Sequence, residues 1–128
     1  MRGLLDTSVF IADEQGRTLD SDRLPDEAAV SVVTLVELEL GVHMADTVAV
    51  RAQRMATLRS VQITYAALAV DEKVAASFAR LVAAERRNGR RPKVQDMWIA
   101  ATAVANDAAL FTQDTDFDDL DGVVVVHV

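Results

Sequence analysis

The sequence predicts one α/β domain with a mainly parallel central sheet and helices on both faces. Short apolar segments rich in Val, Leu and Ala alternate along the chain with longer segments whose apolar residues recur at helical spacing. Strands that alternate with helices favour a parallel sheet that is covered on both sides. The chain has 128 residues, close to the commonest size of a single domain, and no repeat or linker divides it. We therefore expect a single domain over residues 1–128.

The first quarter of the chain predicts two strands with a helix and a loop between them. Arg2–Leu5 (RGLL) is expected to form a short strand, and a helix begins in the following segment SVFIAD, with Thr7 or Ser8 as its N-cap. Residues 14–27 are polar and contain a proline, so they predict a loop that includes at most a turn of helix. Residues 28–33 (AAVSVV) favour β-structure and predict the second strand.

A pair of helices is expected next. The segment TLVELELGVHMA opens with Thr34 as N-cap and carries Glu37 at the position that completes a capping box. Residues 47–58 predict the second helix of the pair. Residues 61–65 (VQITY) then predict a short strand, because β-branched and aromatic residues predominate there.

The second half of the chain predicts two helices and two strands. Residues 71–87 predict a long helix that ends at Asn88 and Gly89. Residues 94–107 (VQDMWIAATAVAND) are apolar on nearly all sides, so we expect this helix to be central and buried. The segments AALFT and VVVVH predict the last two strands, and the acidic segment QDTDFDDLDG between them predicts a loop.

Composition excludes several kinds of site. The chain has no cysteine, so disulfides, thiolate zinc sites and thiol nucleophiles are excluded. No apolar run approaches the roughly 20 residues that span a bilayer, and the first apolar residues are too few for a signal peptide. We therefore expect a cytoplasmic protein that makes no use of a membrane.

The charge of the chain is negative and unevenly distributed. The formal net charge of −7 would by itself make the chain a poor nucleic-acid binder. Five of the 13 basic residues nevertheless lie in RRNGRRPK, the basic segment, which comprises Arg86, Arg87, Arg90, Arg91 and Lys93. Any site for a polyanion is expected to include this segment. The alternative is that these side chains only solvate a helix end and the loop after it.

Several acidic residues follow predicted strands at the carboxyl edge of the sheet, where parallel sheets usually bind their ligands. Asp6 ends the first strand, and Asp114 and Asp116 follow the ALFT strand, so all three belong to the carboxyl edge of the sheet. Glu37, in the first turn after the second strand, faces the same edge, and Asp96 lies near the start of the buried helix. Because ligands of open α/β sheets bind beyond the carboxyl ends of the strands, we expect these acids to converge.

Each acid has an ordinary structural alternative, but together they imply a cation. Asp6 could cap a helix, Glu37 could complete the capping box, Asp96 could favour the helix dipole and Asp114 could be a turn residue. Two like charges about 4 Å apart repel by roughly 4 kcal/mol at an effective dielectric near 20. No Lys or Arg is evidently placed beside all of the acids, so they must take up protons or bind a metal ion. Oxygen ligands without His or Cys suit Mg²⁺ or Mn²⁺, ions that support phosphodiester hydrolysis.

Four acidic segments follow one another along the chain: LLDTSVFI, SVVTLVELELGV, VQDMWIAATA and LFTQDTDFDDL. They resemble, in order and spacing, the acidic motifs of PIN-domain ribonucleases, with VapC toxins of bacterial toxin–antitoxin pairs as the nearest likeness. The resemblance implies a three-layer α/β/α fold and cleavage of RNA that depends on Mg²⁺ or Mn²⁺. Asp6, Glu37, Asp96 and Asp114 match the acidic quartet, and Asp116 matches an additional acid.

The resemblance also implies supporting residues and partners. Thr7, Ser8 and Thr112 stand where hydroxyl groups often support the metal ligands. A VapB-like antitoxin is expected to cover the site, and a homodimer is the default assembly. The helix pair at residues 34–58 is apolar enough to serve either contact. Contact of the basic segment with an RNA backbone becomes the favoured interpretation.

Two rival functions remain at this stage. A magnesium-dependent phosphatase or phosphoacceptor domain also gathers acids at a sheet edge, but it needs a nucleophilic Asp and usually a nearby Lys. The first acidic motif reads DTS rather than DxD, and the only lysines are Lys73 and Lys93. A non-catalytic binding module would be expected to have lost part of the quartet, whereas this quartet is complete.

Overall fold

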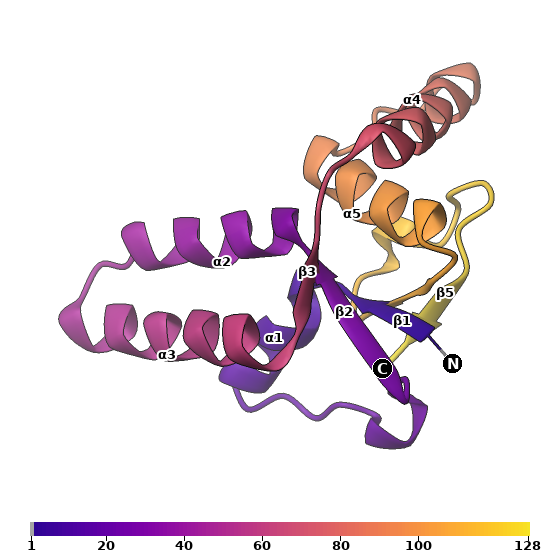
Figure 1. Ribbon diagram of the computed structural model, residues 1–128. Coiled ribbons are helices and arrows are strands. Elements are labelled where there is room, and N and C mark those ends of the chain that lie inside the picture. Colours follow the sequence, from indigo (N-terminus) through magenta and orange to yellow (C-terminus); the bar gives the residue numbers. More distant parts are fainter. Residues whose placement is uncertain (1) are drawn as a thin grey trace.

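Five parallel strands form the centre of residues 2–128, the part of the chain that the computed structural model describes (Figure 1). Their order across the sheet is β3-β2-β1-β4-β5, and every neighbouring pair is parallel. The strands are β1 Arg2–Leu5, β2 Glu27–Ser31, β3 Ala66–Leu68, β4 Ala109–Thr112 and β5 Val125–His127. The predicted α/β class with a parallel sheet is confirmed.

Helices cover both faces of the sheet and complete three layers. They are α1 Thr7–Glu14, α2 Val32–His43, α3 Val48–Thr64, α4 Glu72–Arg87 and α5 Val94–Ala105. Side chains of α1, α2 and α3 pack on one face, and those of α4 and α5 pack on the other. Figure 1 shows α2 and α3 running side by side beyond the edge of the sheet, at the left of the view.

The two buried clusters follow from the alternation of side chains along a strand. Leu4 and Leu110 are fully buried and belong to the cluster beneath α4 and α5. Their neighbours Leu5 and Phe111 belong to the cluster on the opposite face. Because both faces are covered, all of β4 and every residue of β1 except Arg2 are buried.

The predicted N-caps of the first two helices are wrong. Asp6, rather than Thr7 or Ser8, caps α1 and accepts a hydrogen bond from the Ser8 N–H at 3.4 Å. Ser31 caps α2 by accepting from the Val33 N–H at 3.0 Å, so Thr34 lies inside the helix and forms no capping box with Glu37. The predicted second strand spans residues 28–33, but β2 ends at Ser31 because the chain becomes helical at Val32.

The strand predicted at residues 61–65 is also wrong, because α3 continues to Thr64 and β3 begins at Ala66. Leu58 and Val61 are both buried in the same cluster, and their separation of three residues places them on one helix face. Packing of that face overrides the β-propensity of VQITY.

The later elements agree with their predictions. Asp71 caps α4, which ends before Asn88 and Gly89, and Gly89 adopts a φ of +72° that suits glycine. α5 occupies residues 94–105, and six of its residues are buried. The loop between α1 and β2 contains one short 3₁₀ turn, Ser21–Arg23. No helix within residues 2–128 is both long and apolar enough to cross a membrane.

Candidate metal centre

The carboxyl ends of β1 and β4 bring acids from distant parts of the chain to one edge of the sheet. β1 and β4 are neighbours, and Leu5 is paired with Phe111 in their register. Asp6 directly follows β1, and Asp114 follows β4 after one intervening residue. Asp96 lies in the first turn of α5, and Asp116 lies in the 3₁₀ turn Thr115–Phe117. α5 packs against both β4 and this turn, which places its first turn beside the loop acids.

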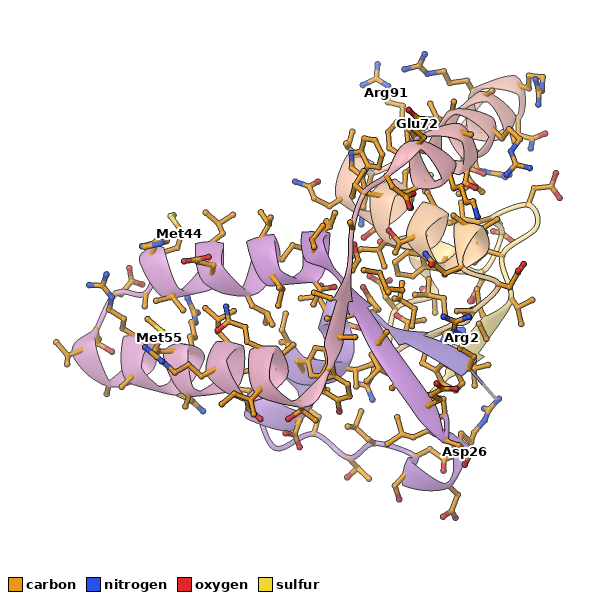
Figure 2. The ribbon with its side chains drawn as sticks, viewed as in Figure 1. Arg2, Asp26, Met44, Met55, Glu72 and Arg91 are labelled. Atoms are coloured by element: carbon orange, nitrogen blue, oxygen red, sulfur yellow. The ribbon has the colours of Figure 1, made fainter. Side chains whose placement is uncertain are left out.

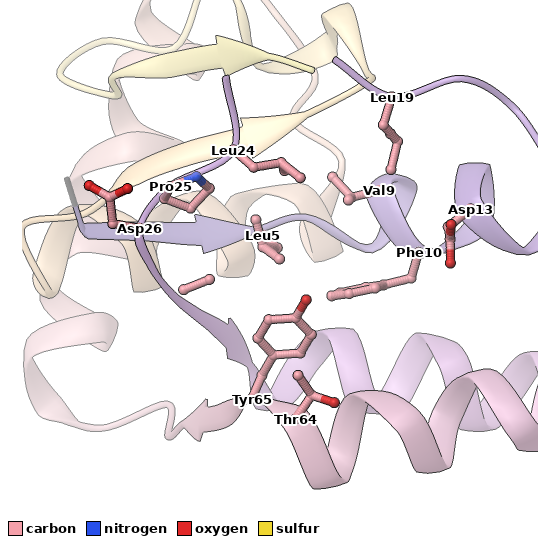
Figure 3. A pocket seen from close by; sticks show the side chains of 11 residues that line it. Leu5, Val9, Phe10, Asp13, Leu19, Leu24, Pro25, Asp26, Thr64 and Tyr65 are labelled. Carbon is pink, nitrogen blue, oxygen red and sulfur yellow. The ribbon is translucent and has the colours of Figure 1, made fainter. Parts of the chain in front are cut away.

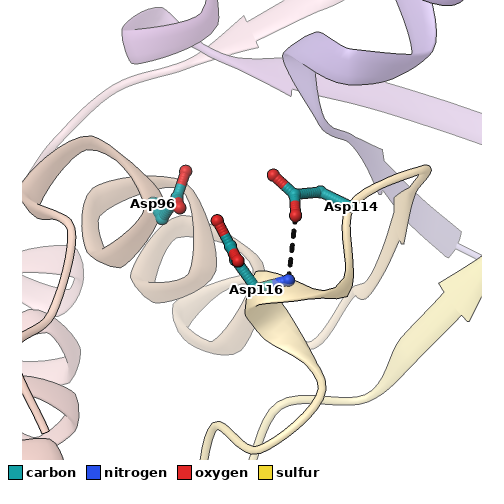
Figure 4. A group of neighbouring side chains, drawn as sticks. All are labelled: Asp96, Asp114 and Asp116. Carbon is teal, nitrogen blue, oxygen red and sulfur yellow. Dashed lines mark hydrogen bonds between the residues drawn. The ribbon is translucent and has the colours of Figure 1, made fainter.

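Three of these acids form a tight group that could hold a divalent cation. Asp96, Asp114 and Asp116 each offer a carboxylate oxygen, and the three oxygens lie within 4.8 Å of one another (Figure 4). The Asp116 N–H donates to Asp114 Oδ1 at 2.9 Å, which fixes the loop between them. A group of oxygen donors without nitrogen or sulfur suits a hard ion. We call these three residues the open half of the site.

Asp6 lies deeper than the open half but interacts with it. Its exposed fraction is 4%, and burial is the main cause that raises the pKa of its carboxyl group. Burial also raises the pKa of Asp96, to about 6, and the charges of Asp6, Asp114 and Asp116 add to that rise. The site therefore disfavours its own full ionisation, because burial and neighbouring negative charges both favour the protonated form of Asp96.

Thr112 connects Asp6 with Asp114. The Thr112 hydroxyl donates to Asp6 Oδ2 at 2.9 Å and accepts from the Asp114 N–H at 2.9 Å. The Ser8 hydroxyl lies 3.1 Å from that of Thr112 and accepts from the Gln113 N–H at 3.0 Å. One buried hydroxyl thus orients acids that follow two different strands.

Glu37 approaches the site from the side of α2. The Thr7 hydroxyl donates to Glu37 Oε1 at 2.8 Å and lies 3.0 Å from the Thr34 hydroxyl. Burial is the main cause that raises the pKa of Glu37, and the charge of Asp6 contributes. Asp6 and Glu37 lie outside the three-acid group. Asp6 is buried and Glu37 is half-buried, and we call this pair the buried half of the site after Asp6. Glu39, two residues further along α2, is exposed.

Lys93 is the cation that sequence reasoning did not place at the acids. Its Nζ donates to Asp116 Oδ2 in an ion pair. That bond is the main cause that raises the pKa of Lys93, and the charges of Asp96 and Asp114 contribute. The available signal was position, because Lys93 precedes Asp96 by three residues at the start of a helix, where such side chains lie on one face.

The basic segment is divided between structural and exposed side chains. Arg90 forms two hydrogen bonds, at 2.9 and 2.7 Å, with the buried carboxylate of Glu85. Arg90 also donates to the Asp119 carbonyl at 3.3 Å, which ties the segment to the acidic loop. Arg86, Arg87 and Arg91 are exposed. Contact of the segment with RNA stays a prediction, and Arg90 has a structural function that the sequence did not reveal.

A hollow of about 490 Å³ lies on the opposite face from α4 and α5, beside α1 and the end of α3 (Figure 3). Phe10 and Tyr65 line it, and their ring centroids are 5.5 Å apart. None of the five predicted site acids lines this hollow. The chemistry of the acids therefore belongs to the sheet edge and not to this hollow.

Comparisons with known proteins agree with this architecture. A family model of the PIN domain matches residues 3–123. Ribonuclease VapC5 of Mycobacterium tuberculosis (strain ATCC 25618 / H37Rv) is 48% identical over 126 residues, which cover 98% of this chain and 93% of that protein. Ribonuclease VapC4 of the same strain is 43% identical over 128 residues, which cover 99% and 97% of the two chains.

A solved structure gives the same result at the level of the fold. A crystal structure of a member of the VapBC family of toxin–antitoxin systems, VapBC-5 from Mycobacterium tuberculosis, contains a chain with a TM-score of 0.88. That chain is 45% identical to this one, and the match covers 99% of this chain and 97% of that chain.

Proposed function

The chain belongs to the PIN-domain family, in which its relatives are named VapC ribonucleases, and we propose that it is a metal-dependent endoribonuclease that acts as the toxin of a toxin–antitoxin pair. The observation that carries this proposal is the open half of the site. Asp96 from α5 and Asp114 and Asp116 from the loop after β4 bring three carboxylate oxygens within 4.8 Å of one another. Such a group suits the recognition of an RNA phosphodiester through a divalent ion.

Asp96, Asp114 and Asp116 would hold a Mg²⁺ or Mn²⁺ ion, with Asp6 behind them. A bound divalent ion supplies a Lewis acid for phosphate oxygens and positive charge for the attacking and leaving oxygens. Asp6 contributes a buried negative charge that strengthens the demand for that ion. Glu37 accepts a hydrogen bond from Thr7 and feels the charge of Asp6, and we assign it to orienting the attacking water.

The substrate's backbone would be guided by the exposed members of the basic segment. Arg91 and Lys93 line a cavity of about 170 Å³ together with Asp96 and Asp116, so positive side chains directly border the acids. Arg86 and Arg87 lie in the last turn of α4, a few residues before Arg91 in the sequence. Phosphates bound along this route would reach the acids from the α4–α5 side.

A VapB-like antitoxin is the partner we propose, by analogy with the toxin–antitoxin assembly named for the similar crystal structure. The surface of this chain that the antitoxin contacts would include an apolar stripe along α2. We define this apolar stripe as Val36, Leu40 and Met44. These residues recur every four positions on one helix face and are 62%, 57% and 68% exposed. Figure 2 shows Met44 near the free end of the α2–α3 pair. Glu37 lies on the same helix, so a chain along the stripe would reach the site.

Metal-dependent cleavage tests the enzymatic proposal directly. Purified protein is incubated with labelled RNA in the presence of EDTA, Mg²⁺ or Mn²⁺, and the new 5′ ends are mapped. We expect cleavage only with the ions, and expect Asp96→Asn to abolish it without changing the circular dichroism spectrum. Asp22→Asn, an exposed acid in the 3₁₀ turn Ser21–Arg23, is the matched control and should cleave normally. Cleavage by Asp96→Asn at the wild-type rate would refute the assignment.

The partner surface has a separate test. Leu40→Asp places a charge on the apolar stripe without disturbing a buried residue, because Leu40 is 57% exposed. We expect this variant to escape inhibition by a co-expressed VapB-like antitoxin while it cleaves RNA as the wild type does. Full inhibition of Leu40→Asp would place the antitoxin elsewhere.

The expected assembly and location have their own tests. Size-exclusion chromatography of the same proteins tests the homodimer, and cell fractionation tests the cytoplasmic location.

A further inference from the structure

Lys93 occupies a place that local helix energetics do not favour. It is the N-cap residue of α5, where Ser, Thr, Asp and Asn are the usual residues, and its side chain makes no capping hydrogen bond. A positive charge at a helix N-terminus also opposes the helix dipole. The helix therefore gains nothing from a lysine at this position, and the reason for its presence must lie in what the side chain contacts.

That contact is the outer edge of the acidic group. The Lys93 ammonium forms an ion pair with Asp116, and the fields of Asp96 and Asp114 also act on it. The side chain of Asp116 is 38% exposed and that of Lys93 is 69% exposed, so the pair lies at the mouth of the site. Asp96 and Asp114 are both less exposed than Asp116, which makes Asp116 the outermost carboxylate of the three.

The position of this pair bears on how many metal ions the site can take. Metal pairs in nucleases lie about 3.5–4 Å apart, so a second ion in this group would need a carboxylate oxygen that the first ion does not use. The first ion can use Asp96, Asp114 and one oxygen of Asp116, and a second ion would depend on the other Asp116 oxygen, Oδ2, to which Lys93 is bonded. An ammonium group at Asp116 would repel a second ion and already satisfies the carboxylate that the ion would need.

We propose that the Lys93 ammonium serves as a built-in second cation: each chain binds one divalent ion among Asp96, Asp114 and Asp116, and Lys93 keeps Oδ2 of Asp116 from binding another. This inference rests on the proposed metal centre. A lysine has three N–H donors and a flexible stem, so the ammonium can reach a phosphate oxygen while it remains beside Asp116. The substrate would then meet one metal ion and one fixed organic cation.

Metal stoichiometry tests the inference without any measurement of cleavage. Mn²⁺ is titrated into metal-free protein, and bound ion is counted by the loss of the free-ion electron paramagnetic resonance signal. We expect about one Mn²⁺ per chain for the wild type and about two for Lys93→Gln, because the variant frees Asp116 for a second ion. Lys73→Gln, an exposed lysine on α4, gives the same change in net charge and should bind about one. Lys93→Arg keeps the charge and should also bind about one.

The second ion must also depend on Asp116. Adding Asp116→Asn to Lys93→Gln should return the count to about one Mn²⁺ per chain. Two ions on the wild type, or one ion on Lys93→Gln, would overturn the role of Lys93 and leave the proposed nuclease intact. No bound ion on any variant would instead remove the metal centre on which the proposed function depends. Thermal melts of each variant show that the fold is retained, which we expect because Lys93 is exposed.

Discussion

The two halves of the site deal with negative charge in different ways. In the buried half, the buried Asp6 accepts a hydrogen bond from the Thr112 hydroxyl, and the half-buried Glu37 accepts one from the Thr7 hydroxyl. The open half, Asp96, Asp114 and Asp116, faces solvent and is bordered by a cation. Burial raises the pKa of Asp6, Glu37 and Asp96, and within residues 2–128 the lysine beside these acids, Lys93, borders the open half.

The difference shows what each half contributes. Hydroxyl groups fix the direction of a carboxylate without cancelling its charge, so the buried half offers oriented carboxylates whose charge is favoured when a cation binds nearby. The open half can exchange one cation for another, because its ligands are accessible. Fixed carboxylates in the buried half and accessible carboxylates in the open half are the arrangement expected of a site that binds a metal ion together with a polyanion.

The largest effect is expected from the buried half. Asp6→Asn removes the central negative charge while its amide oxygen can still accept from Thr112. Cleavage should fall by roughly 10³-fold, equivalent to about 4 kcal/mol of transition-state stabilisation. The melting temperature in EDTA should not fall, because the variant replaces a carboxylate whose charged form is disfavoured by burial. Asp13→Asn, an exposed acid on α1, is the control.

If Asp6→Asn cleaves RNA as the wild type does, the buried half has no catalytic importance. A large drop in the melting temperature of Asp6→Asn would contradict the catalytic role of Asp6 in another way. In that case the Asp6 charge would serve the fold, through the cap of α1, and not the reaction.

The next effect is expected from the hydroxyl group that joins the halves. Thr112→Val keeps the shape of a fully buried side chain but removes the group that donates to Asp6 and accepts from the Asp114 N–H. Loss of such a supporting contact typically costs 10–100-fold in metal affinity or activity, and we expect a loss of about that size in both. Thr112→Ser retains the hydroxyl and should recover most of the activity. Equal activity of the Val and Ser variants would show that the hydroxyl does not position the acids.

The dependence on pH separates the metal-free and metal-bound states. Because the pKa of Asp96 is raised to about 6, the folded metal-free protein holds a proton on Asp96 that the unfolded chain loses above about pH 4. The contribution of Asp96 to the unfolding free energy is therefore greatest below pH 4 and is lost as the pH rises through 6. Asp96→Asn should remove this decline from thermal melts in EDTA.

A bound ion needs the charged form of Asp96, so metal affinity follows the opposite trend. Below pH 6 the apparent affinity for Mn²⁺ should weaken by about tenfold per pH unit, because one proton competes with the ion. Saturating Mn²⁺ should accordingly raise the melting temperature more at about pH 7.5 than at about pH 5. An equal rise at both values would mean that Asp96 does not bind the ion.

The sequence predicts the positions of the acids better than it predicts their surroundings. Asp6 and Asp114 could be placed because Asp6 directly follows one short apolar strand and Asp114 comes two residues after another, and parallel strands deliver such residues to one edge. The contacts of Lys93 and Thr112 could not be predicted, because they depend on how the start of α5 and the end of β4 meet. The same dependence on packing explains why residues 61–65 form helix despite their β-propensity.

The smallest effects are expected in the basic segment, where two neighbouring arginines should differ in kind. Arg91 is exposed at the periphery of the molecule (Figure 2) and lines a cavity together with Asp96 and Asp116, so Arg91→Gln should weaken RNA binding a few-fold at low salt. The slope of log Kd against log salt should fall by about 0.7, the value for one phosphate contact on a single strand. Arg90→Gln should instead lower the melting temperature, because it leaves the buried Glu85 carboxylate without its partner. If Arg91→Gln left the salt slope unchanged, RNA would reach the acids by a route that avoids the start of α5.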